Sequence, residues 1–544
     1  MLPFPVDFAS RRSPIYGRHG IVAASQPLAV AAGLHILGQG GNAVDAAVAV
    51  AAALNVTEPS STGLGGDAFS LFYDARTSAV TALNGSGRAP RMLTLERLQR
   101  EGFGQELPLH HPHTITVPGA CAAWCDIVAR FGRLEMAQIL APAIQLAEEG
   151  FPVAPITAVH WQNEADYLLN HTLNGGELLI DGRGPRPGEI FRNPGLARTM
   201  RKIAEGGKQA FYEGPIAEAI AAVIQQAGGC MQVSDLSEHT STWELPISIH
   251  YRGIQMWECP PNGQGITALL ALNLLEGFDL AALPPLSAER LHLQIEAMRL
   301  AFADSRFYVA DPAFAPAPLE SLLSKEYAAQ RRKLILPWHA NPEIRHGAPV
   351  TASDTVYFSV VDGEGNACSF INSNYHGFGS GIVPSGWGFS LQNRGHNFRL
   401  DPSHPNCLVP GKRPYHTIIP AMATDAQRGD LFACFGVMGG FMQPQGHMQV
   451  FSALVDDDLD PQSALDRPRF CIEPDAIDSR VALEEGMSDA VMNRLQAMGH
   501  QVRKVGGMAR GMFGRGQIIR RDVQSGVLWA GSDPRSDGCA MCLL

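Results

Sequence analysis

The periodicity of apolar residues changes near the middle of the chain, and this change limits the folds that the sequence can adopt. From about residue 120 to 340 apolar residues recur mostly at helical spacing, whereas from 355 onward alternating runs dominate, such as "TVYFSVVD", "ACSFINSN" and "GDLFACFGVMGG". Residues three and four apart share one face of a helix, while alternation is typical of a half-buried strand. Helices and strands segregated in this way predict an α+β layered sandwich.

Several individual elements can also be predicted. Residues 26–56 form an Ala-rich helical pattern that is interrupted at "GQGGN", where the glycines mark a helix end and Asn42 an N-cap. A β-rich stretch follows, with a hairpin turn at 74–77. The clearest helix is "SAERLHLQIEAMRLAFADSRFYV", capped by Ser287. After the later strands we expect a helix near 488–498 and a last strand at "GVLWAGS".

Length and charge narrow the class of protein. A chain of 544 residues is long enough for three or four domains, although large layered enzymes use this length in one. A net charge of -11 with only short basic runs argues against nucleic acid as a partner. No run of eighteen apolar residues predicts a membrane span, and the N-terminus lacks a signal-peptide pattern, so we expect a cytoplasmic location.

Cysteines, histidines and glycines give only weak motifs. Ten cysteines without regular spacing indicate reduced thiols, and we interpret the CxxC at Cys539 and Cys542 as a frayed tail rather than a zinc site. "HHPH" (110–113) has no acidic or Cys partner in the sequence and favours a surface loop over a metal site. "GLGGDAF" (63–69) and "GFGSGIV" (377–383) fit no nucleotide-binding pattern and favour close backbone turns. The sequence therefore predicts neither a metal nor a cofactor.

Two further features carry chemistry only in combination. Thr355 follows Asp354 at the start of a predicted strand; taken alone, a Thr there is usually structural. "GVMGG" (436–440) ends a strand with two glycines, whose uncovered amides are what an oxyanion hole requires, although a simple turn is the commoner explanation.

The ordered set of motifs resembles the γ-glutamyltransferase family of N-terminal-nucleophile hydrolases. The motifs are "GGNAVDAAVA", "TGLGGDAF", "SDTVYFSVVDGEGNA", "GFGSGIV", "GKRP", "GVMGG" and "GASDPRSDG", and they span essentially the whole chain. The resemblance implies a four-layer αββα sandwich and a precursor that cuts itself between Asp354 and Thr355. The products would be a large subunit, 1–354, and a small subunit, 355–544. They would stay associated as a heterodimer, with a dimer of heterodimers as a further possibility.

The same resemblance assigns catalytic roles. Thr355 matches the nucleophile, and its freed α-amine, with an ordinary pKa of about 7.7–8.0, would serve as the base. The family usually has Thr-Thr-His where this chain has "TVY" (355–357). Ser373 takes the place of a hydroxyl residue that hydrogen-bonds the nucleophile. Gly439 and Gly440 match the oxyanion-hole glycines.

The substrate-reading positions depart from the family pattern. Ser86 stands at the position of the family's carboxylate-binding Arg, with Arg88 two residues later, and Asn397 replaces the acidic reader of the α-ammonium. Tyr375 replaces a smaller Asn, and His416 and Thr417 replace two serines.

Losing two charged readers should cost about 3–6 kcal/mol of γ-glutamyl binding. We therefore expect a short carboxylate-bearing amide without an amine, with Arg88 as anchor and Tyr375, Asn397, His416 and Thr417 lining the site. "SNYHGFGSGIVPSGWGFSLQNRGHNF" and "RPYHTIIPAM" most resemble the oxamate amidohydrolase branch, which acts in purine catabolism. The alternatives are a γ-glutamyl hydrolase or transferase, a dicarboxylic-acid acylase of the cephalosporin type, and a binding protein that never cuts itself.

Overall fold

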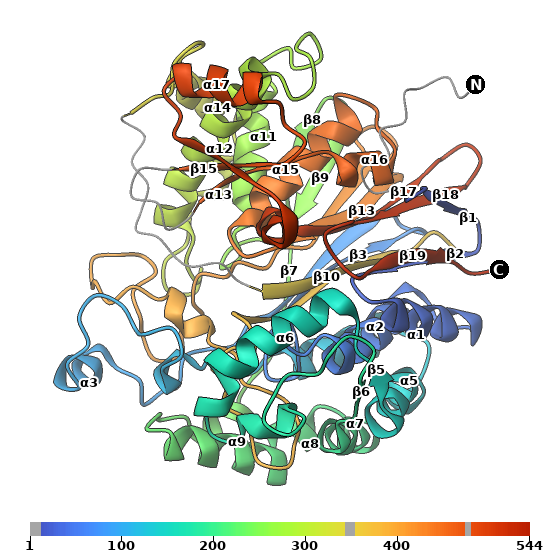
Figure 1. The fold of residues 1–544 in the computed structure, drawn as a ribbon, viewed down its shortest axis with the longest axis vertical. Coiled ribbons are helices and arrows are strands. Elements are labelled where there is room, and N and C mark those ends of the chain that lie inside the picture. The colour runs from blue at the N-terminus through green and yellow to red at the C-terminus, as the bar shows by residue number, and fades with distance from the viewer. Residues whose placement is uncertain (1–11, 343–353, 474–479) are drawn as a thin grey trace.

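Two antiparallel sheets of seven strands each form the centre of the fold in the computed structural model (Figure 1). The structure describes residues 12–342, 354–473 and 480–544. The first sheet has the order β1 (Ile15–Gly17), β18 (Leu528–Ser532), β17 (Arg515–Arg521), β13 (Leu431–Met438), β12 (Ala421–Asp425), β9 (Ile254–Glu258) and β8 (Ile247–Tyr251). The second has the order β19 (Cys539–Cys542), β2 (Gly20–Ala24), β10 (Asp354–Asp362), β11 (Ala367–Tyr375), β3 (Asp67–Asp74), β4 (Ala79–Gly85) and β7 (Thr242–Glu244).

Helices cover the outer face of each sheet, which gives the four layers of an αββα sandwich (Figure 1). The layer over the second sheet includes α1 (Pro27–Gly38), α2 (Ala43–Thr57), α4 (Ala120–Phe131), α5 (Met136–Glu149), α6 (Pro155–Tyr167), α7 (Pro194–Gly206), α8 (Gln209–Tyr212) and α9 (Pro215–Gln226). The layer over the first includes α11 (Gly265–Leu275), α12 (Ala288–Tyr308), α14 (Lys325–Arg332), α15 (Met442–Val455), α16 (Pro461–Asp466) and α17 (Asp489–Ala497).

Shorter elements complete the chain and lie away from the sheet centres. They are α3 (Leu95–Arg100), α10 (Val233–Ser237), α13 (Leu319–Leu322), the pair β5 (Phe151–Pro152) and β6 (Ile190–Phe191), and the three-stranded sheet of β14 (Phe470–Ile472), β15 (Val481–Glu484) and β16 (Val502–Val505).

Alternation along β10 explains how one strand serves two cores. Phe358 and Val360 point to the helices of the α1–α2 layer, while Tyr357 and Val361 enter the core between the two sheets. Successive side chains of a strand face opposite sides, so a strand that is buried on both faces is mostly apolar, and the buried Ser359 of β10 donates a hydrogen bond to the carbonyl of Cys434. The predicted α+β fold and its four layers are confirmed.

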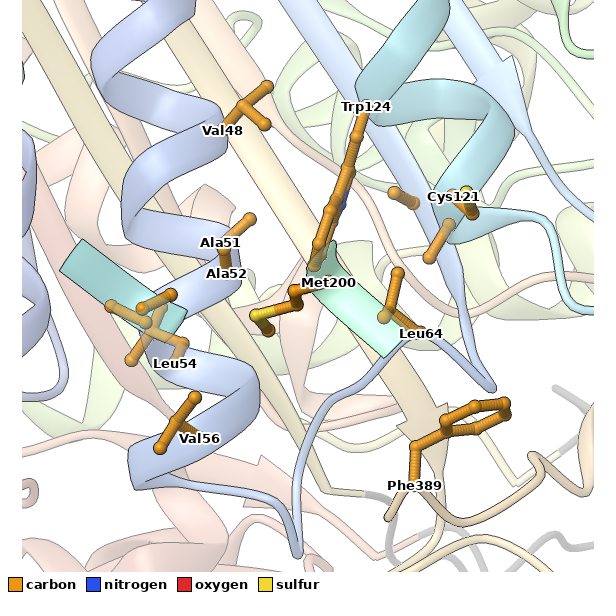
Figure 2. Close-up of a cluster of buried hydrophobic side chains, with 14 of the residues drawn as sticks. Val48, Ala51, Ala52, Leu54, Val56, Leu64, Cys121, Trp124, Met200 and Phe389 are labelled. Atoms are coloured by element: carbon orange, nitrogen blue, oxygen red, sulfur yellow. The ribbon is translucent and has the colours of Figure 1, made fainter. Parts of the chain in front are cut away.

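The helical core beneath β11 holds the site in place. Figure 2 shows Val48, Ala51 and Val56 of α2 packed with Leu64 and Trp124. The indole Nε1 of Trp124 donates a hydrogen bond to Oδ1 of Asn372 at 2.9 Å. Asn372 precedes Ser373 on β11, so the packing of this core fixes the strand that carries Ser373.

Most predicted element boundaries agree with the structure. Asn42 caps α2, its Oδ1 accepting hydrogen bonds from the backbone amides of Val44 and Asp45, and Ser287 caps α12. The ten cysteines are all free. The interpretation of Cys539–Cys542 as a frayed tail was wrong: these residues form β19, which pairs with β2 at the edge of the second sheet.

No helix in the described part of the chain is both long and apolar enough to cross a lipid bilayer. The predicted cytoplasmic location stays a prediction.

Candidate active site

Thr355 lies at the start of β10, beside Ser373 on the neighbouring strand β11. The pairing register shifts at this point, so β11 carries one residue more than β10. Such a bulge re-aims side chains that regular alternation would separate. The Oγ1 of Thr355 lies 3.0 Å from the Oγ of Ser373, and both residues are fully buried. The structure thus brings the predicted nucleophile and its predicted hydroxyl partner into contact.

The hydrogen bonds around Ser373 set the direction of this contact. Its Oγ accepts a hydrogen bond from the backbone N–H of Tyr375 at 2.9 Å and another from Nη2 of Arg394 at 3.1 Å. A hydroxyl has two lone pairs and one hydrogen, so these two donors leave the hydrogen of Ser373 to be donated. Thr355 Oγ1 is an acceptor within reach. Donation to this oxygen stabilises the alkoxide that an attacking Thr must form.

Arg394 is a buried cation that contacts the hydroxyl of Ser373, which in turn contacts Thr355. Its Nη1 donates to Oγ1 of Thr417 at 2.6 Å, and its guanidinium carbon lies 4.4 Å from the ring centroid of Tyr375. Burial lowers the pKa of Arg394 to about 10, so the group stays charged at neutral pH. Its Nε has no hydrogen-bond partner among the described residues. Because a guanidinium has five N–H donors, donors remain that could bind a carboxylate.

Asp67, the first residue of β3, is a buried carboxylate that interacts electrostatically with Arg394. Its Oδ1 accepts hydrogen bonds from the amides of Gly87 at 3.0 Å and Gly119 at 3.2 Å and from Nε2 of Gln392 at 2.9 Å. Burial raises the pKa of Asp67 to about 6, although the positive charge of Arg394 and these hydrogen bonds act in the opposite direction. At pH 7 the carboxylate is therefore mostly ionised and compensates the buried guanidinium.

His416 is bound to Asp67. Its Nε2 lies 2.9 Å from Oδ2 of Asp67, and its Nδ1 accepts a hydrogen bond from the amide of Ile418 at 3.3 Å. The hydrogen of the ring therefore sits on Nε2 and is donated to Asp67. Burial, with a smaller effect of Arg394, holds the pKa of His416 well below its usual range, so the ring is neutral. Both ring nitrogens are used within the protein, so the structure gives His416 no free group for a substrate carboxylate.

Tyr375 connects Arg394 to Asn397. Its buried side chain stands on a backbone with a φ of 81°, a conformation that is strained for a bulky residue and is found at functional sites. The phenol donates a hydrogen bond to Oδ1 of Asn397 at 2.8 Å, and Nδ2 of Asn397 has no partner among the described residues. Of the predicted substrate-reading residues, Tyr375, Asn397 and Thr417 thus gather around Arg394.

Gly439 and Gly440 follow β13 and precede α15. Both have positive φ, 133° and 57°, which favours glycine and leaves their amides without side-chain cover. Nε2 of Gln264 donates to the carbonyl of Gly440 at 2.9 Å, which fixes the peptide that follows the two glycines. Within the described part of the chain neither amide donates a hydrogen bond. This geometry suits an oxyanion hole, which stays a prediction.

Arg88 does not join the cluster around Ser373. It is half-buried, and its Nη1 donates to the carbonyl of Thr240 at 3.4 Å, a carbonyl that also accepts from Nη2 of Arg413. Ser86 accepts a hydrogen bond from Nδ2 of Asn262 at 3.1 Å. The cation that the structure places beside the nucleophile is Arg394, which the sequence reasoning missed.

Arg394 lies in "FSLQNRGHNF", the stretch that predicted a role for Asn397, and Asp67 lies in "TGLGGDAF", the stretch that predicted a glycine-rich turn. An arginine inside an otherwise apolar and amide-rich segment was the available signal. The sequence could not show its partner, because Asp67 comes from the other end of the chain.

The remaining motifs are structural. A Cβ at Gly66 would lie 2.3 Å from the carbonyl oxygen of Ser373, so the loop of Gly63–Gly66 is glycine-rich because it packs against the site backbone. This confirms the interpretation of "GLGGDAF" as a close turn. The expectation that "HHPH" lacks an acidic partner was wrong, because His113 is buried with its Nε2 2.6 Å from Glu101. Over residues 12–342, 354–473 and 480–544 no group of three or more His, Cys, Asp or Glu could hold a metal ion.

Comparison with known proteins relates this geometry to one family. The Gamma-glutamyltranspeptidase family model matches residues 29–543. The glutathione hydrolase-like YwrD proenzyme of Bacillus subtilis is 37% identical over 97% of this chain and 99% of its own length. The oxamate amidohydrolase proenzyme of Klebsiella pneumoniae is 34% identical over 96% of this chain and 98% of its own. The crystal structure of a cephalosporin acylase from Bacillus halodurans superposes with a TM-score of 0.92 at 45% identity, covering 100% of this chain and 99% of that one.

Proposed function

The chain belongs to the gamma-glutamyltranspeptidase family of amide-bond hydrolases, and we propose that it is a self-processing amidohydrolase with Thr355 as its nucleophile. The contact between Thr355 and Ser373 supports this assignment, because a hydrogen bond donated to the attacking oxygen favours its ionised form. Once freed, the α-amine of Thr355 would take the proton of the hydroxyl. With an ordinary pKa of about 7.7–8.0, a useful fraction of such amines is neutral near pH 7.5.

Maturation would cut the bond between Asp354 and Thr355. The related chains are named proenzymes, which agrees with a precursor that is processed into two pieces. Residues 343–353, which precede this bond, lie outside the described residues. Fragments 1–354 and 355–544 would remain associated as a heterodimer, because β10 pairs with β2 and β11 with β3 inside the second sheet.

Arg394 carries the proposal for the acyl group. It is a buried guanidinium with unused donors that contacts Ser373, the same hydroxyl that contacts Thr355. A carboxylate bound there lies close to the carbonyl under attack. Oxamate has this arrangement, because its carboxylate carbon is bonded directly to its carboxamide carbon. We therefore propose oxamate as the substrate and Arg394, in place of Arg88, as its anchor.

The reaction would proceed in two steps. In the first, Thr355 Oγ1 bonds to the amide carbon, the amides of Gly439 and Gly440 stabilise the oxyanion, and the C–N bond breaks with the proton of the hydroxyl passing through the α-amine to ammonia. In the second, water bonds to the carbonyl carbon of the oxalyl ester as the α-amine takes one of its protons, the ester C–O bond breaks, and that proton passes to Oγ1 of Thr355. Oxalate leaves, and its new carboxyl group loses the other proton to solvent. Arg394 would hold the substrate carboxylate through both steps.

The γ-glutamyl alternative is less favourable at this site. Its α-ammonium would meet Asn397, and the buried charge beside the nucleophile is the guanidinium of Arg394, which repels a cation. A dicarboxylic-acid acylase is the second candidate, and the 45% identity to the cephalosporin acylase favours it. Such an enzyme would use the same nucleophile and would differ in the length of the acyl chain.

A pair of substrates tests the proposal. Mature protein, identified by two fragments on a denaturing gel, should release ammonia from oxamate far faster than it cleaves a γ-glutamyl anilide. Glutaramate has three methylene carbons between its carboxylate carbon and its amide carbon, and it tests the dicarboxylic alternative in the same assay. If the γ-glutamyl anilide or glutaramate is turned over faster than oxamate, the assigned acyl group is γ-glutamyl or glutaryl and not oxalyl.

A further inference from the structure

A pocket with a cationic lining adjoins the candidate active site. Two arginines from different segments line it, Arg306 of α12 and Arg399, together with His404. Asn397, Tyr415 and Phe441 also contribute to its wall. None of the described residues that line this pocket carries a carboxylate, although the chain as a whole has a net charge of -11. The lining therefore presents two guanidinium groups, of which that of Arg399 is paired with Glu106 outside the lining.

One hydrogen bond and two sequence neighbours relate this pocket to the catalytic cluster. Asn397 accepts the hydrogen bond of the Tyr375 phenol, and the ring of Tyr375 lies against Arg394. Tyr415 stands two residues before Thr417, which accepts from Arg394. Phe441 directly follows Gly440 of the predicted oxyanion hole. The pocket thus shares Asn397 with the candidate active site, and two of its other lining residues are close in sequence to Thr417 and Gly440.

The polar groups of the pocket are held in place by the protein. The guanidinium carbon of Arg306 lies 5.2 Å from the ring centroids of both Phe302 and Phe441. Arg399 donates from Nη1 to Glu106 at 2.7 Å. Burial, and then the charge of Arg399, lower the pKa of His404, so the positive charge at neutral pH comes from the two arginines.

Asn397 supplies a second, independent observation. The residue is only 6% exposed, and its Nδ2 has no hydrogen-bond partner among the described residues. A buried N–H donor without an acceptor is unfavourable, and an acceptor on a bound ligand would satisfy it. A carboxylate is such an acceptor, and it is also the group that two guanidinium groups favour.

We propose that this pocket binds a substrate carboxylate that lies beyond the reach of Arg394, so that the enzyme prefers amides carrying such a carboxylate to the matched uncharged amides. The proposal deepens the proposed amidohydrolase function and rests on it. In a substrate with two carboxylates, one would lie at Arg394 and the second at Arg306, Arg399 and Asn397. The second carboxylate could belong to the leaving amine or to a longer acyl chain; both present the same chemistry to the pocket.

Matched amides separate these two sources. N-oxalylglycine and N-ethyloxamate share the oxalyl group and differ by a carboxylate on the leaving amine. N-methylglutaramate and N-methylbutyramide share the leaving amine and differ by a carboxylate on the acyl chain. For the pair whose carboxylate reaches the pocket, mature wild-type enzyme should prefer the charged member by about tenfold or more in kcat/KM, which corresponds to one charge-assisted hydrogen bond.

Substitutions then locate the effect. Arg306→Gln and Arg399→Gln should each reduce that preference about tenfold and leave kcat/KM for oxamate within about twofold. Arg399 lies on a partly exposed segment, so its variant remains informative if Arg306→Gln fails to fold. Arg428→Gln is the matched control, because Arg428 is exposed and pairs only locally with Asp425 and Asp430.

The outcomes distinguish the pocket from the acyl-group assignment. If only the glutaryl pair shows a preference for the charged amide, and Arg306→Gln loses it, the pocket is supported and the assignment of oxamate as substrate is overturned. Equal turnover of both members in both pairs, or a preference that Arg306→Gln and Arg399→Gln leave intact, would overturn the pocket. If no amide is hydrolysed, calorimetric titration with both pairs gives the same comparison as affinities, and equal affinities of the two members in both pairs would overturn the pocket.

Discussion

Replacement of Arg394 by Met should abolish most turnover while maturation continues. The Met side chain keeps much of the apolar stem but loses every donor, so it removes the hydrogen bonds to Ser373 and Thr417. It also leaves Asp67 without the positive charge that opposes its burial, so the pKa of Asp67 should rise further above about 6.

The size of the effect follows from the contacts. A hydrogen bond to a charged group contributes about 1.5–3 kcal/mol. Two such bonds bear on turnover: the observed one to Ser373 and the proposed one to the substrate carboxylate. Their loss corresponds to about 3–6 kcal/mol, or roughly two to four powers of ten in kcat/KM. Arg394→Lys should be intermediate, because one ammonium cannot reproduce the planar fork that serves Ser373, Thr417 and a carboxylate together.

The assay is ammonia release from oxamate, with kcat and KM reported separately for protein that shows two fragments on a gel. Arg88→Gln is the matched comparison, because the sequence favoured Arg88 as anchor whereas the structure directs its guanidinium to Thr240. We expect a change of less than about threefold for Arg88→Gln, in the range of ordinary surface substitutions. A hundredfold loss in Arg88→Gln with near-wild-type turnover in Arg394→Met would refute the assignment of the anchor.

Three further predictions concern the same site. Thr355→Ala should remain a single chain of 544 residues by mass spectrometry, whereas the wild type should yield a fragment beginning at Thr355; a cut at this bond in the variant would exclude self-cleavage by Thr355. Gly440→Val should lower kcat by about 10²–10³, because a β-branched side chain is strained at the φ of 57° and would displace the Gly440 amide from the oxyanion, with the far-ultraviolet circular dichroism unchanged; full activity would remove Gly440 from the mechanism. Because burial raises the pKa of folded Asp67 from 3.8 to about 6, its contribution to stability is present at low pH and is lost as the pH rises through about 6. Asp67→Asn should flatten this fall in the urea midpoint between about pH 4 and 7, and parallel curves for the two proteins would contradict the raised pKa.

Sequence patterns predicted those elements whose signals are local. The N-cap of α2 at Asn42, the turn between β3 and β4 and the capped helix α12 each depend on a few neighbouring residues. The strand at Cys539–Cys542 was missed because an edge strand of four residues has little periodicity of its own. Its conformation is fixed by β2, which lies more than five hundred residues earlier in the chain and supplies the pairing.

The site residues that the sequence could predict are likewise those with local signals. Thr355 and Ser373 could be matched by motif, because their spacing is set by one hairpin. The roles of His416 and Arg394 could not, because both depend on Asp67, a residue that lies far from them along the chain. Position in a motif gave His416 a substrate-reading role, whereas its two ring nitrogens are occupied by Asp67 and Ile418.

The proposed cut would divide this buried network between two chains. Asp67 belongs to fragment 1–354, while Gln392, Arg394 and His416 belong to fragment 355–544. Separation of the fragments would leave a carboxylate and a guanidinium without their compensating partners and would open the central sheet between β2 and β10 and between β3 and β11. The charge that is proposed to read the substrate is therefore held by a residue of the other fragment. It follows that neither fragment could provide a working site alone.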